Sequence, residues 1–212
     1  MVKKLFFILA IILIPQMSLA QRIQYSVPFV SQAPRGNWKD AVFKDACEET
    51  SLLMAQAWIF GQQIDPVWAE QQIHQAANWE KQRFGFHQDT SVADTYVLAT
   101  EYFHLPAELV ENIGVEEVKQ ALADKSLVIT AIDGSKLYLK GPPRHMIVVS
   151  GFDETSNEFI YSDPMKAQGM NLRVSSEKFQ NALRDYPSGI HRRVNGQSTA
   201  MIKIYWPWIM GP

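Results

Sequence analysis

The hydrophobic pattern of this 212-residue chain changes its period near the middle. Up to about residue 123, apolar side chains recur at the three- and four-residue spacing of helices. Beyond that point, short apolar runs rich in β-branched residues fit buried strands. Helices followed by a meandering sheet predict an α+β fold, with a helical N-terminal part packed on an antiparallel sheet.

Local signals set the expected bounds of these elements. Asp65-Pro66 is a helix N-cap followed by proline at the first helical position, and Gly61 is a typical helix stop. A turn at residues 154–157 predicts a β-hairpin around it. The expected helices are 47–61, 65–84, one through 92–103 capped by Thr90 or Ser91, 115–123, and a short one capped by Ser176; the expected strands are 126–132, 145–152, 158–162 and 199–205.

The N-terminus has the pattern of a secretory signal. Two lysines precede an unbroken apolar run from Leu5 to Ile14, and a small-x-small ending leads to Ala20. Ten apolar residues are too few for the ~20 that span a bilayer, which disfavours the alternative of an uncleaved anchor. We therefore expect residues 1–20 to be removed after Ala20, leaving a secreted or periplasmic domain of residues 21–212 without stable membrane insertion.

The charge balance excludes several classes of partner. The chain has 20 basic and 22 acidic residues, and two of the lysines lie in the signal, so the remainder has a net charge of −4. This is not the basic surface expected for binding nucleic acid or an anionic membrane. The pattern leaves small molecules, peptides and cell-wall material as substrates.

Common cofactor and metal motifs are absent from the sequence. There is no phosphate-binding or dinucleotide-binding glycine loop, no HExxH, no EF-hand loop and no GxSxG elbow. The five histidines lack zinc-ligand spacing, and a single cysteine cannot build a structural zinc site. We expect neither a metal nor a cofactor.

Cys47 is the only cysteine. Exported proteins usually pair their cysteines, so an unpaired one indicates either a reactive thiol or a small buried hydrophobe. Its position at a helix start favours reactivity, because the helix dipole and free N–H groups lower a thiol pKa from about 8.5. Glu48 and Glu49 would oppose this if they faced the sulfur, but helical geometry allows both to face away.

Two residues of the expected hairpin could serve such a thiol. His145 opens the most apolar strand, where it could reach a nucleophile on a facing helix; the alternative is an exposed histidine. Asp163 ends the next strand and could orient the imidazole; the alternative is a turn aspartate before proline. Asp153 lies at the far end of the His145 strand, about 25 Å away at ~3.3 Å per residue, and is excluded.

Gln32 precedes the cysteine in the chain. Its side-chain N–H and the Cys47 backbone N–H could together hold the oxyanion of a tetrahedral intermediate. Alone, a glutamine is equally consistent with a surface polar residue.

In combination these residues resemble the C39-like cysteine peptidases of the papain-like clan. The order is glutamine, cysteine at a helix start, histidine at a strand start, then Asp-Pro. The resemblance runs from about residue 26 to the end of the chain. The matching segments are 27–32, Asn37-Trp38, 46–54, 145–153 and 160–164.

The resemblance implies a papain-like fold in which Cys47 is the nucleophile, His145 the base and Asp163 the orienting residue, with Gln32 in the oxyanion hole. It also implies a peptide or protein substrate. The family's bacteriocin-processing branch has Cys-Gly-Pro where this chain has Cys47-Glu-Glu, and no transporter segment is apparent, so double-glycine leader cleavage does not carry over.

We therefore expect acyl transfer through a thioester, with peptide-bond cleavage as the reaction. A thioesterase, amidase or acyltransferase could use the same triad. The alternative from another class is a non-catalytic peptide-binding protein that retains the fold.

Overall fold

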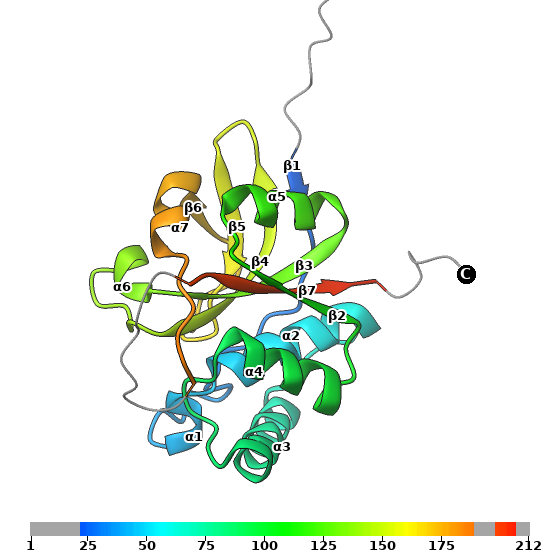
Figure 1. The fold of residues 1–212 in the computed structure, drawn as a ribbon. Helices are drawn as coiled ribbons and strands as arrows, with labels where there is room; N and C mark the ends of the chain where they lie inside the picture. The colour runs from blue at the N-terminus through cyan, green and yellow to red at the C-terminus, as the bar shows by residue number, and fades with distance from the viewer. Residues whose placement is uncertain (1–21, 189–197, 207–212) are drawn as a thin grey trace, which may run out of the picture.

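The computed structural model describes residues 22–188 and 198–206 and has the expected α+β architecture. The predicted signal and its cut site after Ala20 lie outside these residues. Figure 1 shows the helical first part below the sheet and the remaining helices on the sheet's other side. None of the helices within the described ranges is long and apolar enough to cross a membrane.

One antiparallel sheet of seven strands organises the described residues. Its order is β2-β7-β3-β4-β5-β6. β3 pairs with the first part of β4, and the short β1 pairs with the last part. The strands are β1 Arg22–Gln24, β2 Ala107–Glu111, β3 Ser126–Ile132, β4 His145–Asp153, β5 Glu158–Ser162, β6 Leu172–Ser175 and β7 Ala200–Tyr205.

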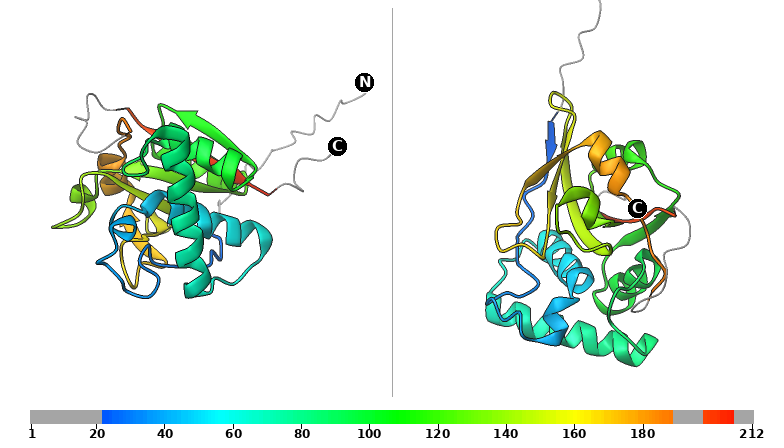
Figure 2. Two further views of the ribbon diagram at one scale, coloured as in Figure 1. Left: turned by 90° about the horizontal axis from the view of Figure 1, so that it is seen from below. Right: turned by 90° about the vertical axis from the view of Figure 1, so that its left-hand side faces the viewer.

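The helices lie in two groups, one on each side of the sheet (Figures 1 and 2). α1 to α4 cover one face, and α5 and α7 cover the other. The helices are α1 Ala41–Lys44, α2 Cys47–Phe60, α3 Pro66–Phe84, α4 Val92–Val97, the π-helical turn η1 Leu98–Tyr102, α5 Val115–Ala123, α6 Gly134–Leu137 and α7 Ser176–Ala182.

The capping residues act largely as expected. The Asp65 carboxylate accepts hydrogen bonds from the backbone N–H groups of Val67 and Trp68, and Gly61 ends α2 in the left-handed conformation. Ser91, not Thr90, caps α4. The cap of α7 is Ser175, one residue before the predicted Ser176.

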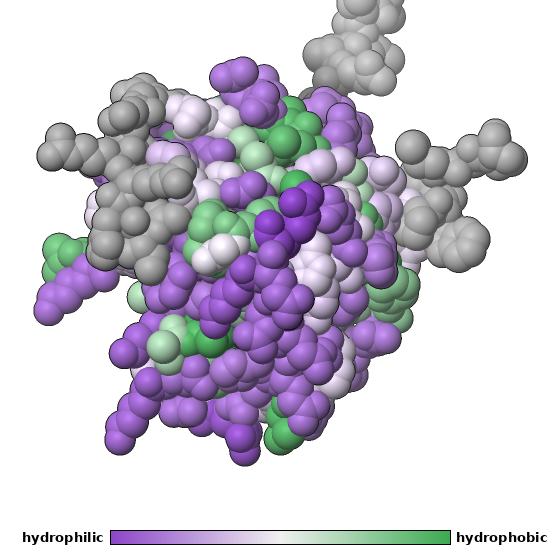
Figure 3. All heavy atoms as spheres, turned by 60° about the horizontal axis from the view of Figure 1, so that its bottom comes forward, coloured by the Kyte–Doolittle hydropathy of each residue, from purple (hydrophilic) through white to green (hydrophobic). Residues whose placement is uncertain are grey.

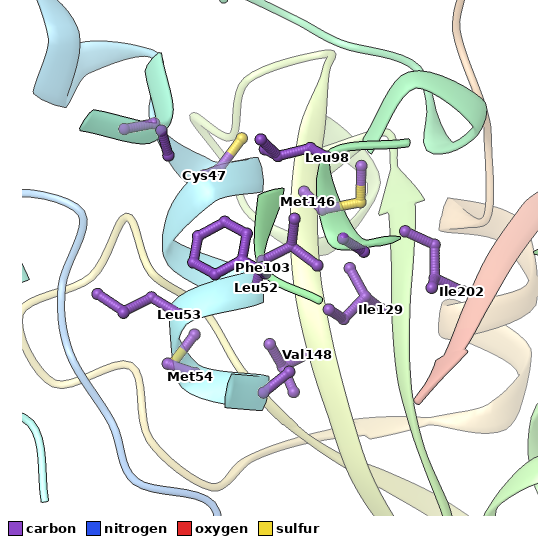
Figure 4. Close-up of a cluster of buried hydrophobic side chains, with 14 of the residues drawn as sticks. Cys47, Leu52, Leu53, Met54, Leu98, Phe103, Ile129, Met146, Val148 and Ile202 are labelled. Atoms are coloured by element: carbon purple, nitrogen blue, oxygen red, sulfur yellow. The ribbon is translucent and has the colours of Figure 1, made fainter. Parts of the chain in front are cut away.

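Each face of the sheet has its own hydrophobic core. In the first, α2 packs against β3 and β4, where Leu52, Ile129 and Val148 are fully buried (Figure 4). In the second, Phe159 and Phe179 stack with ring centroids 4.5 Å apart. Figure 3 shows that the outer face of the helical part is mostly hydrophilic, with apolar side chains only in scattered spots.

A β-bulge interrupts the β4–β5 hairpin. Val149 pairs with Tyr161 and Gly151 with Ile160, so Ser150 is an extra residue on β4. Gly151 is required there because a Cβ atom would lie 2.2 Å from the carbonyl oxygen of Ile23 on the neighbouring β1. The bulge thus sets the register of the hairpin that carries His145 and Asp163.

Candidate active site

Cys47 is the first residue of α2, at the end of the helix that points toward the start of β4. It is 7 % exposed and lies beside Met146 in the first core (Figure 4). A hydrogen bond from the Met146 backbone reaches the sulfur. Since Met146 follows His145 directly, this contact fixes the thiol next to the strand position of the histidine.

His145 and Asp163 form a buried pair. The Nε2 atom of His145 lies 2.6 Å from Oδ1 of Asp163, and both side chains are at most 2 % exposed. Burial alone would raise the pKa of Asp163, but the hydrogen bond and the charge of His145 outweigh it and lower that pKa. A carboxylate only accepts hydrogen bonds, so Nε2 is the donor to Asp163, and in the neutral imidazole Nδ1 is then the basic nitrogen.

The loop after β5 holds Asp163 firmly. Its Oδ1 also accepts the Met165 backbone N–H at 2.9 Å, so the residue is a turn aspartate as well as the partner of the histidine. Its backbone N–H donates to the carbonyl of Gly169, where a Cβ atom would lie 2.0 Å from the Asp163 carbonyl oxygen. Asp163 therefore caps this turn and contacts the histidine at the same time.

Two tyrosines that the sequence pattern did not single out lie behind Asp163. The hydroxyls of Tyr138 and Tyr161 are 2.8 Å apart, and burial followed by the charge of Asp163 raises the pKa of Tyr138. Tyr138 therefore stays neutral. Their spacing in the sequence gives no signal, because α6 and β5 are brought together only by the fold.

Gln32 is buried near the same carboxylate loop, since its backbone N–H donates to Pro164 at 2.8 Å. Its side-chain Nε2 donates to the carbonyls of Phe43 and Lys44 at 2.9 and 3.1 Å. Both amide hydrogens are thus engaged, and an oxyanion would have to share the longer of these bonds. The alternative of a surface glutamine is wrong, because the side chain is only 2 % exposed.

One pocket brings together three of the four predicted site residues, Gln32, Cys47 and His145, with Asp163 directly behind the histidine. Lys44, Asp45, Glu48, Asp89, Pro142, Pro143, Arg144 and Met165 complete its lining. Asp153, excluded from the sequence, lies at the other end of β4 and pairs with Arg173 at 3.0 Å.

The thiol differs from expectation in its charge environment. Its Sγ donates to Oε2 of Glu48 at 3.0 Å, so Glu48 faces the sulfur instead of pointing away. Burial, and then the charge and hydrogen bond of Glu48, raise the Cys47 pKa well above its usual range. The expected lowering of the thiol pKa by the helix start is therefore wrong for this state, in which the sulfur donates its hydrogen bond to Glu48.

More buried acids lie behind Glu48. Glu49 and Glu80 are both 0 % exposed, and Oε1 of Glu49 is 3.4 Å from Nδ1 of His87. Burial and the charge of Glu49 raise the pKa of Glu80 well above that of a free glutamate. A search for groups of three His, Cys, Asp or Glu suited to a metal ion finds none in the ranges the structure describes.

We compared the chain with known protein families and solved structures. The model of the Peptidase_C39 like family matches residues 24–188. The crystal structure of a candidate C39-like peptidase from Bacillus anthracis superimposes with a TM-score of 0.56 and 17% identity, over 87% of this chain and 98% of that one, and so shares the fold. UfSP from C. elegans matches at a TM-score of 0.45 and 12% identity over 89% of this chain and 35% of its own, too weakly to carry an argument. No curated protein sequence matches significantly.

Proposed function

Since the chain belongs to the C39-like peptidase family, we propose that it is an exported cysteine hydrolase that cleaves peptide bonds. The observation that carries the proposal is the buried His145–Asp163 pair at 2.6 Å in a pocket shared with Cys47. A histidine whose Nε2 is held by a carboxylate presents Nδ1 as a base, which is the geometry a thiol nucleophile needs. Export, and a single domain over residues 21–212, rest on the sequence pattern.

The reaction would proceed in two acyl transfers. Nδ1 of His145 takes the thiol hydrogen, and the Cys47 thiolate forms a bond to the carbonyl carbon of the substrate. The oxyanion is held by the Cys47 backbone N–H, which has no acceptor within the helix, and by the Gln32 amide hydrogen released from Lys44. The imidazolium then protonates the leaving amine, and water attacks the thioester with His145 again as base.

A digest of a peptide library by the purified protein, read by mass spectrometry, tests this mechanism. Cys47→Ala and His145→Ala should each abolish cleavage while the fold remains, because members of a catalytic unit fail together. His74→Ala is the matched control, since His74 lies on α3 with its Nε2 3.1 Å from Asp40, outside the pocket lining. Cleavage by the Cys47→Ala variant at the wild-type rate would refute the thiol mechanism.

One observation favours the second candidate, a peptide-binding protein without turnover. The Cys47 thiol donates a hydrogen bond to Glu48, and the pKa of this thiol is raised, which favours a neutral thiol. Such a protein would retain library peptides uncleaved, and Cys47→Ala would leave their binding unchanged. The acyl group is also open to test, because thioester and simple amide substrates assayed beside peptides separate a thioesterase or amidase from a peptidase.

A further inference from the structure

Glu48 is a buried carboxyl with two specific partners. It is 0 % exposed, and burying a charged group without partners is costly. Its Oε2 accepts the hydrogen of the Cys47 thiol at 3.0 Å, and its Oε1 accepts from the Tyr186 hydroxyl at 3.2 Å. Burial, and then the charge of Glu49, raise the pKa of Glu48 well above its usual range, and the hydrogen bond from Cys47 opposes this shift. Because both carboxyl oxygens accept a hydrogen bond, this geometry leaves neither of them to carry a hydrogen of its own.

The tyrosine contact is built by the tertiary fold. Tyr186 is 138 residues away in the sequence and is 2 % exposed. Its segment is tied to the start of α4, because the Asp185 carboxylate accepts the Val92 backbone N–H at 3.1 Å. The Tyr186 hydroxyl therefore holds Glu48 in place beside the sulfur.

The other titratable groups around Glu48 come from both sides of the pocket and from several elements. Within α2, Glu49 is the next residue. The sheet contributes His145 at the same pocket, and the segment after α7 contributes Tyr186. The full set facing the Cys47–Glu48 contact is Glu49 on α2, Glu80 on α3, His87 and Asp89 in the loop after α3, His145 on β4 and Tyr186, with Lys44, Asp45 and Arg144 at the pocket wall.

We propose, on the basis of the proposed hydrolase function, that Glu48 is a further catalytic residue that holds the Cys47 sulfur as a neutral thiol in the free protein. The nucleophile then forms only when the thiol hydrogen leaves Glu48 for His145. In that step the S–H bond breaks and an N–H bond forms at Nδ1, giving a thiolate and an imidazolium. Glu48 keeps its charge and its Tyr186 hydrogen bond throughout.

The charge of Glu48 explains why a thiolate would not persist in the free protein. A like charge close to the sulfur disfavours a second negative group, and burial of both side chains strengthens this effect. The repulsion is relieved once the sulfur bonds to the substrate carbonyl carbon, because the negative charge then moves to the oxyanion. The site would thus protect its own nucleophile from alkylation and oxidation between turnovers, since the thiolate is the reactive form.

Thiol titration tests the proposal without a substrate. Glu48→Gln keeps the shape of the side chain and removes its charge, so the midpoint of Cys47 ionisation should fall by about 1–3 pH units. The midpoint is read from the ultraviolet absorbance of the thiolate, with Cys47→Ala as the blank, and again from the pH dependence of iodoacetamide labelling. A one-unit fall corresponds to about tenfold faster labelling below the midpoint.

Glu49→Gln is the matched control. Glu49 is equally buried and adjacent, but its Oε1 faces His87 at 3.4 Å, and its charge is the least of the influences on the thiol. Its substitution should shift the midpoint much less than that of Glu48. Glu48→Met replaces the carboxyl by an apolar side chain of similar size and should give the same fall if Glu48→Gln does not fold.

The outcomes are distinct. Equal midpoints in wild type and Glu48→Gln, or equal shifts from both glutamate substitutions, would overturn the role of the Glu48 contact. If the midpoint of Cys47 ionisation falls in Glu48→Gln but the wild-type protein cleaves no peptide, the role of the Glu48 contact is supported and the hydrolase proposal is refuted. Because the titration needs no turnover, the two failures cannot be confused.

Discussion

The burial of Glu80 on α3 should make the stability of this protein fall as pH rises through the weakly acidic range. Its side chain is 0 % exposed and faces Glu49 and Thr90. In its protonated form Glu80 can donate a hydrogen bond to Glu49, whereas two carboxylates at this site would repel each other. Its pKa in the folded chain therefore lies well above the ordinary value, with burial as the main cause and the charge of Glu49 next.

Proton linkage gives the direction and the size of this change in the free energy of unfolding. Below about pH 4.3, the usual pKa of glutamate, Glu80 is protonated in both states and its contribution to stability is fully present. Above that pH the unfolded chain loses the proton while the folded chain keeps it, so the free energy of unfolding drops by up to about 1.4 kcal/mol per pH unit. The drop ends once the pH has passed through the raised pKa of the folded state.

The assay is urea unfolding at a series of pH values, with wild type and Glu80→Gln compared at each. The glutamine cannot ionise, so the difference in unfolding free energy between the two proteins should change by about 1.4 kcal/mol per pH unit between pH 5 and 6. Glu116→Gln is the control, because the Glu116 side chain is 75% exposed. Parallel curves for wild type and Glu80→Gln would show that Glu80 is ionised in the folded protein, and the reasoning from burial would fail.

Four further outcomes are expected. Asp163→Asn should lower kcat, though less completely than Cys47→Ala, because the amide no longer favours the histidine tautomer with a free Nδ1; an unchanged kcat would exclude the orienting role. Gln32→Ala should lower kcat by roughly 10²–10³ with little change in KM, and an effect on KM alone would exclude it from the oxyanion hole. Phe159→Ala should lower the free energy of unfolding by about 3–5 kcal/mol in urea titrations, since the ring is fully buried against Phe179; a loss below 1 kcal/mol would contradict the tight packing of that core. Protein recovered from the exported fraction should begin at Gln21 by intact mass, and the mass of the full chain would instead indicate a retained anchor.

Elements with strong local signals could be predicted from the sequence. The Asp65-Pro66 start, the Gly61 stop and the β-branched run of β3 each reflect a backbone preference that acts within a few residues. The missed elements β1, β2, α1, α6 and β6 are at most five residues long, and the strands β1 and β2 pair with distant parts of the chain. The π-helical turn Leu98–Tyr102 was predicted as ordinary helix, and it differs from one in the carbonyl to which each backbone N–H donates its hydrogen bond.

The sequence predicted residues that the structure brings together, but it did not predict their charge environment. Cys47, His145 and Gln32 line one pocket with Asp163 behind it, and the start of α2 and the β4–β5 hairpin, which carry three of the four, have local sequence signals. The orientation of Glu48 was not foreseen. Every residue from Cys47 to Ala55 is buried, so α2 has no solvent-facing side in its first turns to which a glutamate could point. Only the packing of α3 and the segment of Tyr186 reveals this.

The extra residue Ser150 has a consequence for recognising active relatives of this chain. With the bulge, the β4–β5 register continues to place Asp163 opposite Ile147; a regular ladder extended from the Gly151–Ile160 pair would place it opposite Val148. A shift of one residue turns a strand side chain to the other face, away from the histidine. A homologue that lacks one residue between Val149 and Gly151 could therefore retain cysteine, histidine, aspartate and glutamine and still be unable to form the pair. Alignments of this family should score that single column as strictly as the four side chains.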